Sequence, residues 1–167
     1  MQKFMGAAFK YYRPLYSIFA FVTLALLLRF QFSIESSSLF SVTIYSYLPG
    51  IIAALTGLSI MIFCINKYFY EMSGLRAIQN SQPKNTLKQS GLHRYVRHPL
   101  YLGTLLFIYG LFLIFPLTNN LIAVIIITTY VLCGIRLEEK KLRAKFGETY
   151  IEYAKKVPQL IPGLKAL

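Results

Sequence analysis

Four long apolar runs, separated by polar segments, dominate the hydrophobic pattern of the chain. They cover Pro14–Phe32, Tyr47–Ile65, Pro99–Phe115 and Leu121–Ile135. A helix needs about 20 apolar residues, with a lower limit of about 17, to cross the hydrocarbon core of a bilayer. The first two runs meet this requirement, and the last two lie near its lower limit. The pattern therefore predicts about four transmembrane helices.

The last two runs are close together in the sequence. Only Pro116–Asn120 separates them, so we expect an antiparallel helical hairpin. The chain is thus predicted to be an all-α integral membrane protein with a single membrane-embedded domain over residues 1–167. Residues 1–70 would form two N-terminal spans. Residues 71–167 would form a polar loop, the C-terminal hairpin and a final amphipathic helix.

The segment after the fourth run has helical periodicity with a polar character. Four apolar or aromatic positions recur at spacings of four, four and three, as one stripe on a helix does: Leu142, Phe146, Tyr150 and Tyr153. Basic residues cover much of the remaining surface. We therefore predict that Arg136–Lys156 is a cytoplasmic amphipathic helix, which lies on the membrane surface or caps the bundle.

Composition and charge support a membrane protein and give it an orientation. The chain is 56% hydrophobic and only 14% charged, and its mean hydropathy is +0.52. Apart from Arg29, every Lys and Arg lies before the first run, between the second and third, or after the fourth. The positive-inside rule then places both termini in the cytoplasm. The net charge of +12 needs no nucleic-acid partner, and attraction to anionic membrane lipids is expected.

The residues that could take part in catalysis or ligand binding lie beside the third and fourth runs. Both histidines lie within residues 90–103, and His98 directly precedes Pro99. Proline is favoured in the first turn of a helix, so His98 should stand at a helix mouth that attracts anions. Glu138 and Glu139 follow the fourth run, in a chain with only six acidic residues. We expect these groups to converge on one site at the cytoplasmic side of the membrane.

Each of these residues also has a purely structural interpretation. Glu139 can pair with Arg143, and Glu138 with Lys141, at ordinary helix spacings. His98 can simply cap a helix. The two cysteines lie inside apolar runs, without the paired spacing of a disulfide or a metal site.

Taken together, the motifs resemble the isoprenylcysteine carboxyl methyltransferase family, a group of integral-membrane, S-adenosylmethionine-dependent enzymes. The first family motif is matched by Gly91, Tyr95, Arg97, His98, Pro99, Tyr101 and Gly103. The second is matched by Glu138, Glu139, Leu142, Phe146, Gly147, Tyr150 and Tyr153. The resemblance covers roughly the C-terminal half of the chain.

This resemblance implies S-adenosylmethionine as cofactor and assigns a set of residues to it. The implied cofactor-binding residues are Asn85, Thr86, Leu87, Lys88, His93, His98, Pro99, Leu100, Tyr101 and Glu138. Arg136 and Glu138 are the implied catalytic residues, and no metal is implied. Two positions depart from the family: His93 replaces a usual Tyr, and Gly134 replaces an Arg that binds a substrate carboxylate. Arg136 is the nearby candidate to take over that role.

The expected reaction is methylation of a carboxylate on a lipophilic or lipidated substrate. A carboxylate is ionised at neutral pH, so this transfer needs no general base. Three alternatives stay open. The first is N-methylation of an amine, as in phospholipid methyltransferases, with His93 as the base. The others are a nicotinamide-dependent membrane reductase and a non-enzymatic protein that binds anionic lipid.

Overall fold

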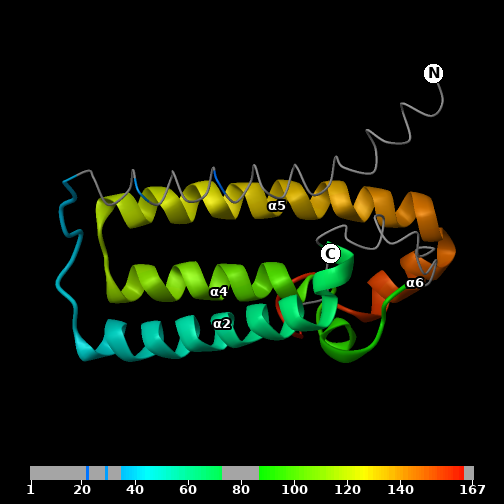
Figure 1. Ribbon diagram of the computed structural model, residues 1–167, viewed down its shortest axis with the longest axis horizontal. Helices are drawn as coiled ribbons and strands as arrows, with labels where there is room; N and C mark the ends of the chain where they lie inside the picture. Colours follow the sequence, from blue (N-terminus) through cyan, green and yellow to red (C-terminus); the bar gives the residue numbers. More distant parts are fainter. Residues whose placement is uncertain (1–21, 23–28, 30–34, 73–86, 164–167) are drawn as a thin grey trace, which may run out of the picture. The chain divides into compact units, whose positions relative to one another are not determined.

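The computed structural model describes residues 35–72 and 87–163, together with Val22 and Arg29. Its elements are α2 (Ile44–Met72), the 3₁₀ helix η1 (Gly91–Arg94), α4 (Pro99–Ile114), α5 (Thr118–Phe146) and α6 (Glu148–Lys156) (Figure 1). In these ranges the only β pairing is one isolated bridge, between Ser38 and Leu117. The all-α prediction is therefore confirmed for the described part of the chain.

Two described helices are long and apolar enough to cross a membrane, namely α2 over Ile44–Lys67 and α5 over Thr118–Phe146. Both carry large apolar side chains on their surface, such as Ile52 and Ile126, which are 58% and 60% exposed. Contiguous exposed apolar surface is typical of contact with lipid or another protein. Helix α4 is shorter, and the first predicted span lies outside the described residues except for Val22 and Arg29.

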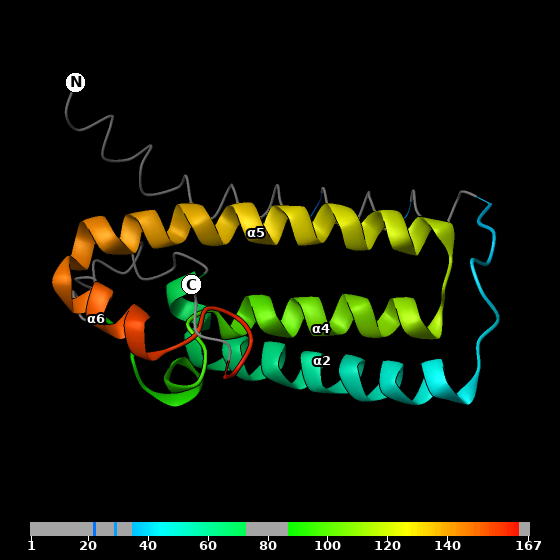
Figure 2. The same ribbon diagram turned by 180° about the vertical axis from the view of Figure 1, so that it is seen from behind.

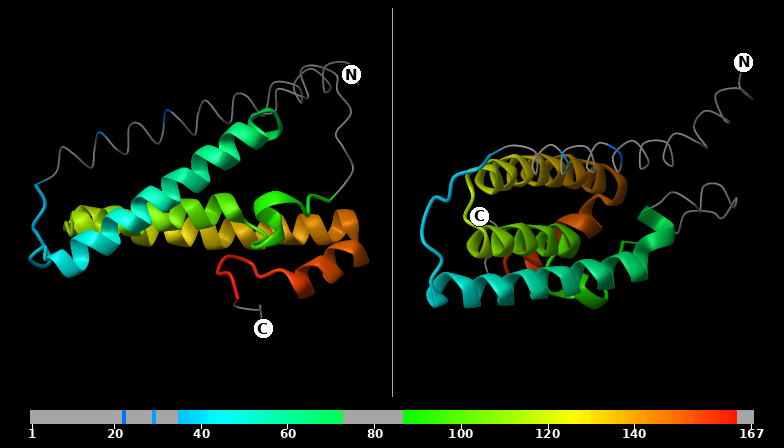
Figure 3. Two further views of the ribbon diagram at one scale, coloured as in Figure 1. Left: turned by 90° about the horizontal axis from the view of Figure 1, so that it is seen from below. Right: turned by 60° about the vertical axis from the view of Figure 1, so that its left-hand side comes forward.

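The chain divides into two compact units. One comprises residues 1–35 and 65–85, and the other comprises residues 36–64 and 86–167. The second unit contains most of α2, all of η1, α4, α5 and α6, and all the site residues described below. Within it, α4 lies between α2 and α5, and α2 crosses the other two helices at an angle (Figures 1 and 3).

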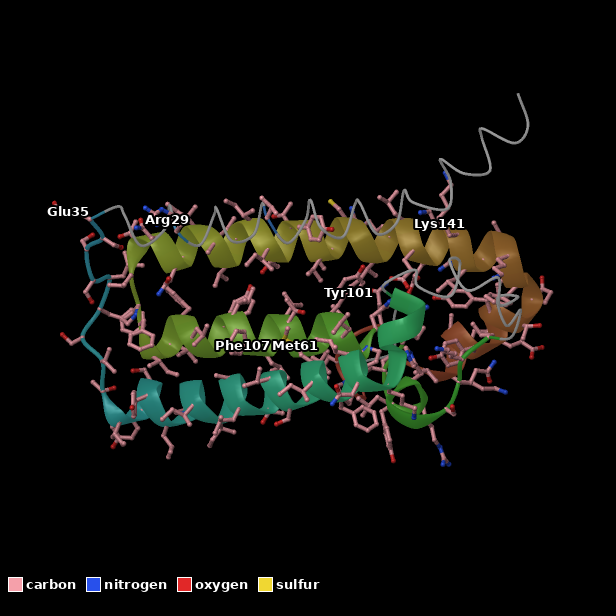
Figure 4. All side chains as sticks on the ribbon, in the orientation of Figure 1. Arg29, Glu35, Met61, Tyr101, Phe107 and Lys141 are labelled. Atoms are coloured by element: carbon pink, nitrogen blue, oxygen red, sulfur yellow. The ribbon has the colours of Figure 1, made fainter. Side chains whose placement is uncertain are left out.

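Small residues let α2 and α4 approach closely and antiparallel to each other. A Cβ atom added to Gly57 would lie 2.5 Å from both the carbonyl oxygen of Gly103 and the amide nitrogen of Phe107. A second glycine contact, between Gly50 and Gly110, lies about two helical turns farther along α2. Met61 and Phe107 lie at the same interface (Figure 4). Glycines at such positions favour close helix packing in membranes. Here they fix the position of α4 along the axis of α2.

The predicted antiparallel hairpin is present as α4 and α5. The side-chain amide of Asn120 donates to the carbonyl oxygen of Phe115 at 2.7 Å, which closes the turn. The segment before α2 pairs with this turn, because the amide of Leu39 donates to Pro116 at 2.7 Å and that of Thr118 donates to Ser37 at 3.1 Å. These bonds join the start of α2 to the hairpin.

Beyond Ile135 the structure differs from the predicted boundaries. Helix α5 continues without a break to Phe146, and Gly147 then ends it with φ 53°. This left-handed conformation favours glycine, and it turns the chain back so that α6 runs as a separate helix (Figure 2). The segment Arg136–Lys156 is therefore two helices around a glycine corner. Tyr150 and Tyr153 are buried by this turn.

Candidate functional site

The first component of the site is η1, which is held between α4 and α6. Gly91 starts it with φ 67°. The Nδ1 atom of His93 lies 3.0 Å from the carbonyl oxygen of Arg97. Because a carbonyl only accepts, Nδ1 carries the proton and Nε2 of the neutral ring is an acceptor. The hydroxyl of Tyr153 donates to the carbonyl oxygen of His93 at 2.6 Å. Burial lowers the pKa of His93 and outweighs the opposing bond to Arg97, so the ring is neutral at pH 7.

The second component is the start of α4, where the helix begins at Pro99 as the sequence predicts. His98 is buried, and its ring lies between the two carboxylates of α5. Its Nε2 is 3.3 Å from Oε1 of Glu139, and its Nδ1 is 3.7 Å from Oε2 of Glu138. The expected convergence of these groups is thus present. The two carboxylates differ, because the side chain of Glu139 is 9% exposed and that of Glu138 is 48% exposed.

Glu139 is the centre of a buried polar cluster. Its Oε1 is 2.9 Å from Nη1 of Arg97 and accepts a hydrogen bond from Nε2 of Gln159 at 3.0 Å. Its Oε2 faces Nη2 of Arg143 at 3.6 Å, the helix pairing that the sequence suggests. Within the described residues, Nε and Nη1 of Arg97 make no hydrogen bond of good geometry, and neither does the buried hydroxyl of Tyr150. Two buried nitrogens of Arg97 therefore lack a well-formed hydrogen bond, although Nη1 faces the Glu139 carboxylate as an ion pair.

The third component is the chain after α6, residues 157–163, which we call the C-terminal strap. Its backbone carbonyls accept from the amides just before α4: Pro158 accepts from Arg97 at 2.9 Å, and Gln159 accepts from His98 at 3.1 Å. The strap therefore lies directly against the mouth of α4. These two bonds fix the position from which the Gln159 side chain reaches Glu139.

Tyr101 connects the mouth of α4 to α5. Its hydroxyl lies near the Glu138 carboxylate, and its side chain extends toward α5 (Figure 4). A Cβ atom on Gly134 would lie 3.3 Å from this hydroxyl. The glycine thus leaves room for the tyrosine. The amides of Leu100 and Tyr101 belong to the first helical turn, which has no intrahelical acceptors for its N–H groups.

The structure brings some predicted site residues together and separates others. The ring of His98 lies beside both Tyr101 and Glu138. His93 is linked to this group through Arg97. Pro99 is buried, Leu87, Lys88 and Leu100 are half-buried, and Asn85 and Thr86 lie outside the described residues. Arg136 is exposed. It precedes Glu138 by two residues, which rotates it about 200° around the helix axis. Its catalytic role stays a prediction.

Arg97 and Gln159 received no site role from the sequence, and Glu139 was expected at the site but without an assigned role. Arg97 and Glu139 belong to the matched motifs, so the motifs themselves were the available signal. Gln159 lies outside both motifs, and nothing in its sequence surroundings distinguishes it. Among the described residues, no group of three His, Cys, Asp or Glu side chains is arranged to hold a metal ion.

Comparison with known proteins identifies the family. A family model described as "Protein of unknown function (DUF1295)" matches residues 4–157. The chain is 36% identical over 110 residues to methanethiol S-methyltransferase of Crocosphaera subtropica, a match that covers 60% of this chain and 40% of that protein. It is 40% identical over 81 residues to methanethiol S-methyltransferase 2 of Bradyrhizobium diazoefficiens, covering 45% and 28% respectively.

A more distant relative is protein-S-isoprenylcysteine O-methyltransferase of Schizosaccharomyces pombe, 34% identical over 77 residues, covering 46% of this chain and 33% of that protein. The matches thus span less than half the length of these curated relatives. No solved structure matches the chain. Because the family model covers most of the sequence, the chain belongs to the DUF1295 family, within the membrane methyltransferases that resemble isoprenylcysteine carboxyl methyltransferase.

Proposed function

We propose that the protein is an S-adenosylmethionine-dependent methyltransferase that methylates a lipophilic thiol at the cytoplasmic surface of the membrane. The observation that carries this proposal is the meeting of the α4 mouth with the acidic pair of α5. His98 lies within 3.3 Å of Glu139 and 3.7 Å of Glu138. A site that combines helix N–H donors with carboxylates is suited to a ligand that carries both negative and positive groups.

The residues present fit this cofactor. S-adenosylmethionine supplies an electrophilic methyl group on a sulfonium, and it also carries a carboxylate and an ammonium. The amides of Leu100 and Tyr101 are suited to hold its carboxylate. Glu138, with a half-exposed side chain, is suited to one of the cationic groups. Tyr101 is placed to orient Glu138 through its hydroxyl.

The charges around the site favour a neutral acceptor over an anionic one. Arg97 and His98 both face carboxylates, and Arg136 is exposed. An anionic acceptor beside Glu138 would meet like charge, which is unfavourable in a partly buried site. A thiol enters as a neutral group and avoids this repulsion. The names of the Crocosphaera and Bradyrhizobium relatives support the same acceptor class.

A thiol must lose its proton, because the thiolate is the nucleophile. His93 is the residue suited to accept it. Its proton sits on Nδ1, which faces the carbonyl oxygen of Arg97 at 3.0 Å, so Nε2 is the basic atom. Burial lowers the pKa of His93, which keeps the ring neutral and able to act as a base at pH 7. S-adenosylmethionine, when bound, would supply the methyl group to the sulfur of the thiolate.

O-methylation of a lipophilic carboxylate, as in an isoprenylcysteine, is the second candidate. The name of the Schizosaccharomyces relative favours it, and it needs no base. The two candidates differ in one testable respect. Thiol methylation depends on a proton acceptor, so replacement of His93 should abolish it, whereas carboxylate methylation should tolerate that change.

The proposal is tested with detergent-purified protein. Calorimetry should detect binding of S-adenosylhomocysteine but not of NADPH, and Glu138→Gln should weaken that binding at least fivefold. The matched control is Glu152→Gln, at an exposed position of α6. With methyl-labelled S-adenosylmethionine, a long-chain alkanethiol should yield labelled thioether. Binding of NADPH alone, or of neither ligand, would overturn the cofactor assignment. Label that appears only in the ester of a farnesylated cysteine would overturn the thiol assignment.

A further inference from the structure

We infer that Gln159, on the C-terminal strap, is a positioning residue that orients the Glu139 carboxylate and, through it, the imidazole of His98. The family model ends at residue 157, so this residue lies beyond the part of the chain that the family defines. The effect on His98 stands on the described contacts alone. The effect on the cofactor rests on the proposed function.

Several donors crowd around one oxygen of the Glu139 carboxylate. Three groups from two segments, the residues before α4 and the C-terminal strap, lie around Oε1 of Glu139: Nη1 of Arg97 at 2.9 Å, Nε2 of Gln159 at 3.0 Å and Nε2 of His98 at 3.3 Å. The other oxygen faces Arg143, whose side chain is 61% exposed. The buried donors therefore set the carboxylate orientation, because the exposed ion pair is weak and mobile.

Gln159 reaches His98 in two independent ways. Its backbone carbonyl accepts from the His98 amide at 3.1 Å, and its side chain reaches the His98 ring through Glu139. The neighbouring bond from the Arg97 amide to Pro158, at 2.9 Å, fixes the strap at the same point. The main chain and the ring of His98 are thus held by one residue of the strap.

Without Gln159, the remaining donors hold the Glu139 carboxylate less well. Nη1 of Arg97 meets Glu139 as an ion pair but without good hydrogen-bond geometry. The bond from the Gln159 amide to the carboxylate is therefore the shortest well-formed hydrogen bond in the cluster, at 3.0 Å. Hydrogen bonds to charged groups are stronger than neutral ones. Its loss should let the carboxylate rotate and release the His98 ring.

The chain offers a direct readout, because it contains only two histidines. In protein labelled with ring-¹⁵N-histidine, two sets of imidazole nitrogen signals are expected, one for each histidine, and His93→Gln assigns them. Gln159→Leu keeps the side-chain bulk but removes the donor. We expect the Nε2 proton of His98 to exchange with water about tenfold faster in this variant, as loss of about one charge-assisted hydrogen bond implies. The exposed strap variant Ile161→Ala should leave the exchange unchanged.

A double-mutant cycle separates a positioning role from simple folding support. Glu139→Gln alone should speed the exchange, and adding Gln159→Leu should then have little further effect, because Gln159 acts through Glu139. Should Gln159→Leu not fold, Gln159→Asn, which keeps the amide but shortens its reach, should give a smaller change in the same direction. Additive effects, or an unchanged His98 proton in Gln159→Leu, would overturn the inference.

The same variants separate this inference from the proposed function. If the wild-type protein binds S-adenosylhomocysteine, Gln159→Leu should weaken that affinity about fivefold to tenfold, and Ile161→Ala should not. If the wild-type protein binds none, the cofactor assignment fails, but the His98 exchange experiment still decides whether Gln159 positions Glu139.

Discussion

Removal of one partner from the buried Arg97–Glu139 pair should destabilise the protein more than removal of both. The two side chains are 3% and 9% exposed, and Nη1 lies 2.9 Å from Oε1. At an effective dielectric constant of about 20, charges at this separation attract by about 6 kcal/mol before desolvation is counted. Glu139→Ala leaves the Arg97 charge buried. We therefore expect it to lower the free energy of unfolding by about 3–5 kcal/mol.

The double variant Arg97→Met with Glu139→Leu removes both charges and keeps the apolar volume. Replacement of a buried ion pair by apolar groups is often neutral. Here it also deprives Gln159 of its acceptor, which costs about 1–2 kcal/mol. The double variant should therefore be more stable than Glu139→Ala by about 2 kcal/mol. It should nevertheless lose the proposed cofactor binding, since His98 is no longer held.

The measurement is equilibrium unfolding in mixed micelles, in which the fraction of denaturing detergent is raised and helix content is followed by circular dichroism. Glu152→Ala is the matched control, because Glu152 is exposed on α6. It should change the free energy of unfolding by less than about 0.5 kcal/mol. A Glu139→Ala variant as stable as this control would refute the reasoning. The reasoning would also be refuted if the double variant lost as much free energy of unfolding as Arg97→Met and Glu139→Leu lose together as single variants.

Three further predictions follow from single positions. Gly57→Ala places a methyl group 2.5 Å from backbone atoms of α4, including the amide of Phe107, and should cost about 1–3 kcal/mol in the same unfolding assay. Gly134→Ala puts a Cβ 3.3 Å from the Tyr101 hydroxyl, and should weaken S-adenosylhomocysteine binding a few-fold in calorimetry while stability changes little. Because burial lowers the pKa of His93, the folded protein binds fewer protons there than the unfolded chain. Stability should therefore fall as pH drops from about 6.5 toward the folded pKa, and His93→Gln should remove that part of the pH dependence.

The sequence predicts the fold best where a local signal marks a boundary. The apolar run and Pro99 place the start of α4, and the short polar turn places the hairpin. The end of α5 was missed because the apolar run stops at Ile135, although the following residues favour helix. Hydrophobicity measures the environment of a helix and not its length. Gly147 was the stop signal, and the left-handed φ of 53° there shows why.

The candidate site was predictable only in part, for a related reason. The predicted hairpin places His98 and the two glutamates at the same end of the pair of helices, and the paired motifs, rather than periodicity or composition, indicate that these side chains meet. Gln159 carried no signal at all. It is a single polar residue between two prolines, and its importance depends on a tertiary contact with Glu139. Such a contact leaves no trace in a single sequence.

The contacts that hold the site differ in kind from those that hold the helices. Close glycine packing fixes α4 against α2, and Gly103 at that interface lies only one turn beyond the mouth of the helix. The strap and η1 are instead held by hydrogen bonds, several of which end on Arg97, His98 or Glu139, while another joins Tyr153 of α6 to His93 of η1. Individual hydrogen bonds contribute about 1 kcal/mol net. A polar assembly of this size is therefore less stable than the helical frame beneath it, and the geometry of the site depends on those few bonds being made together.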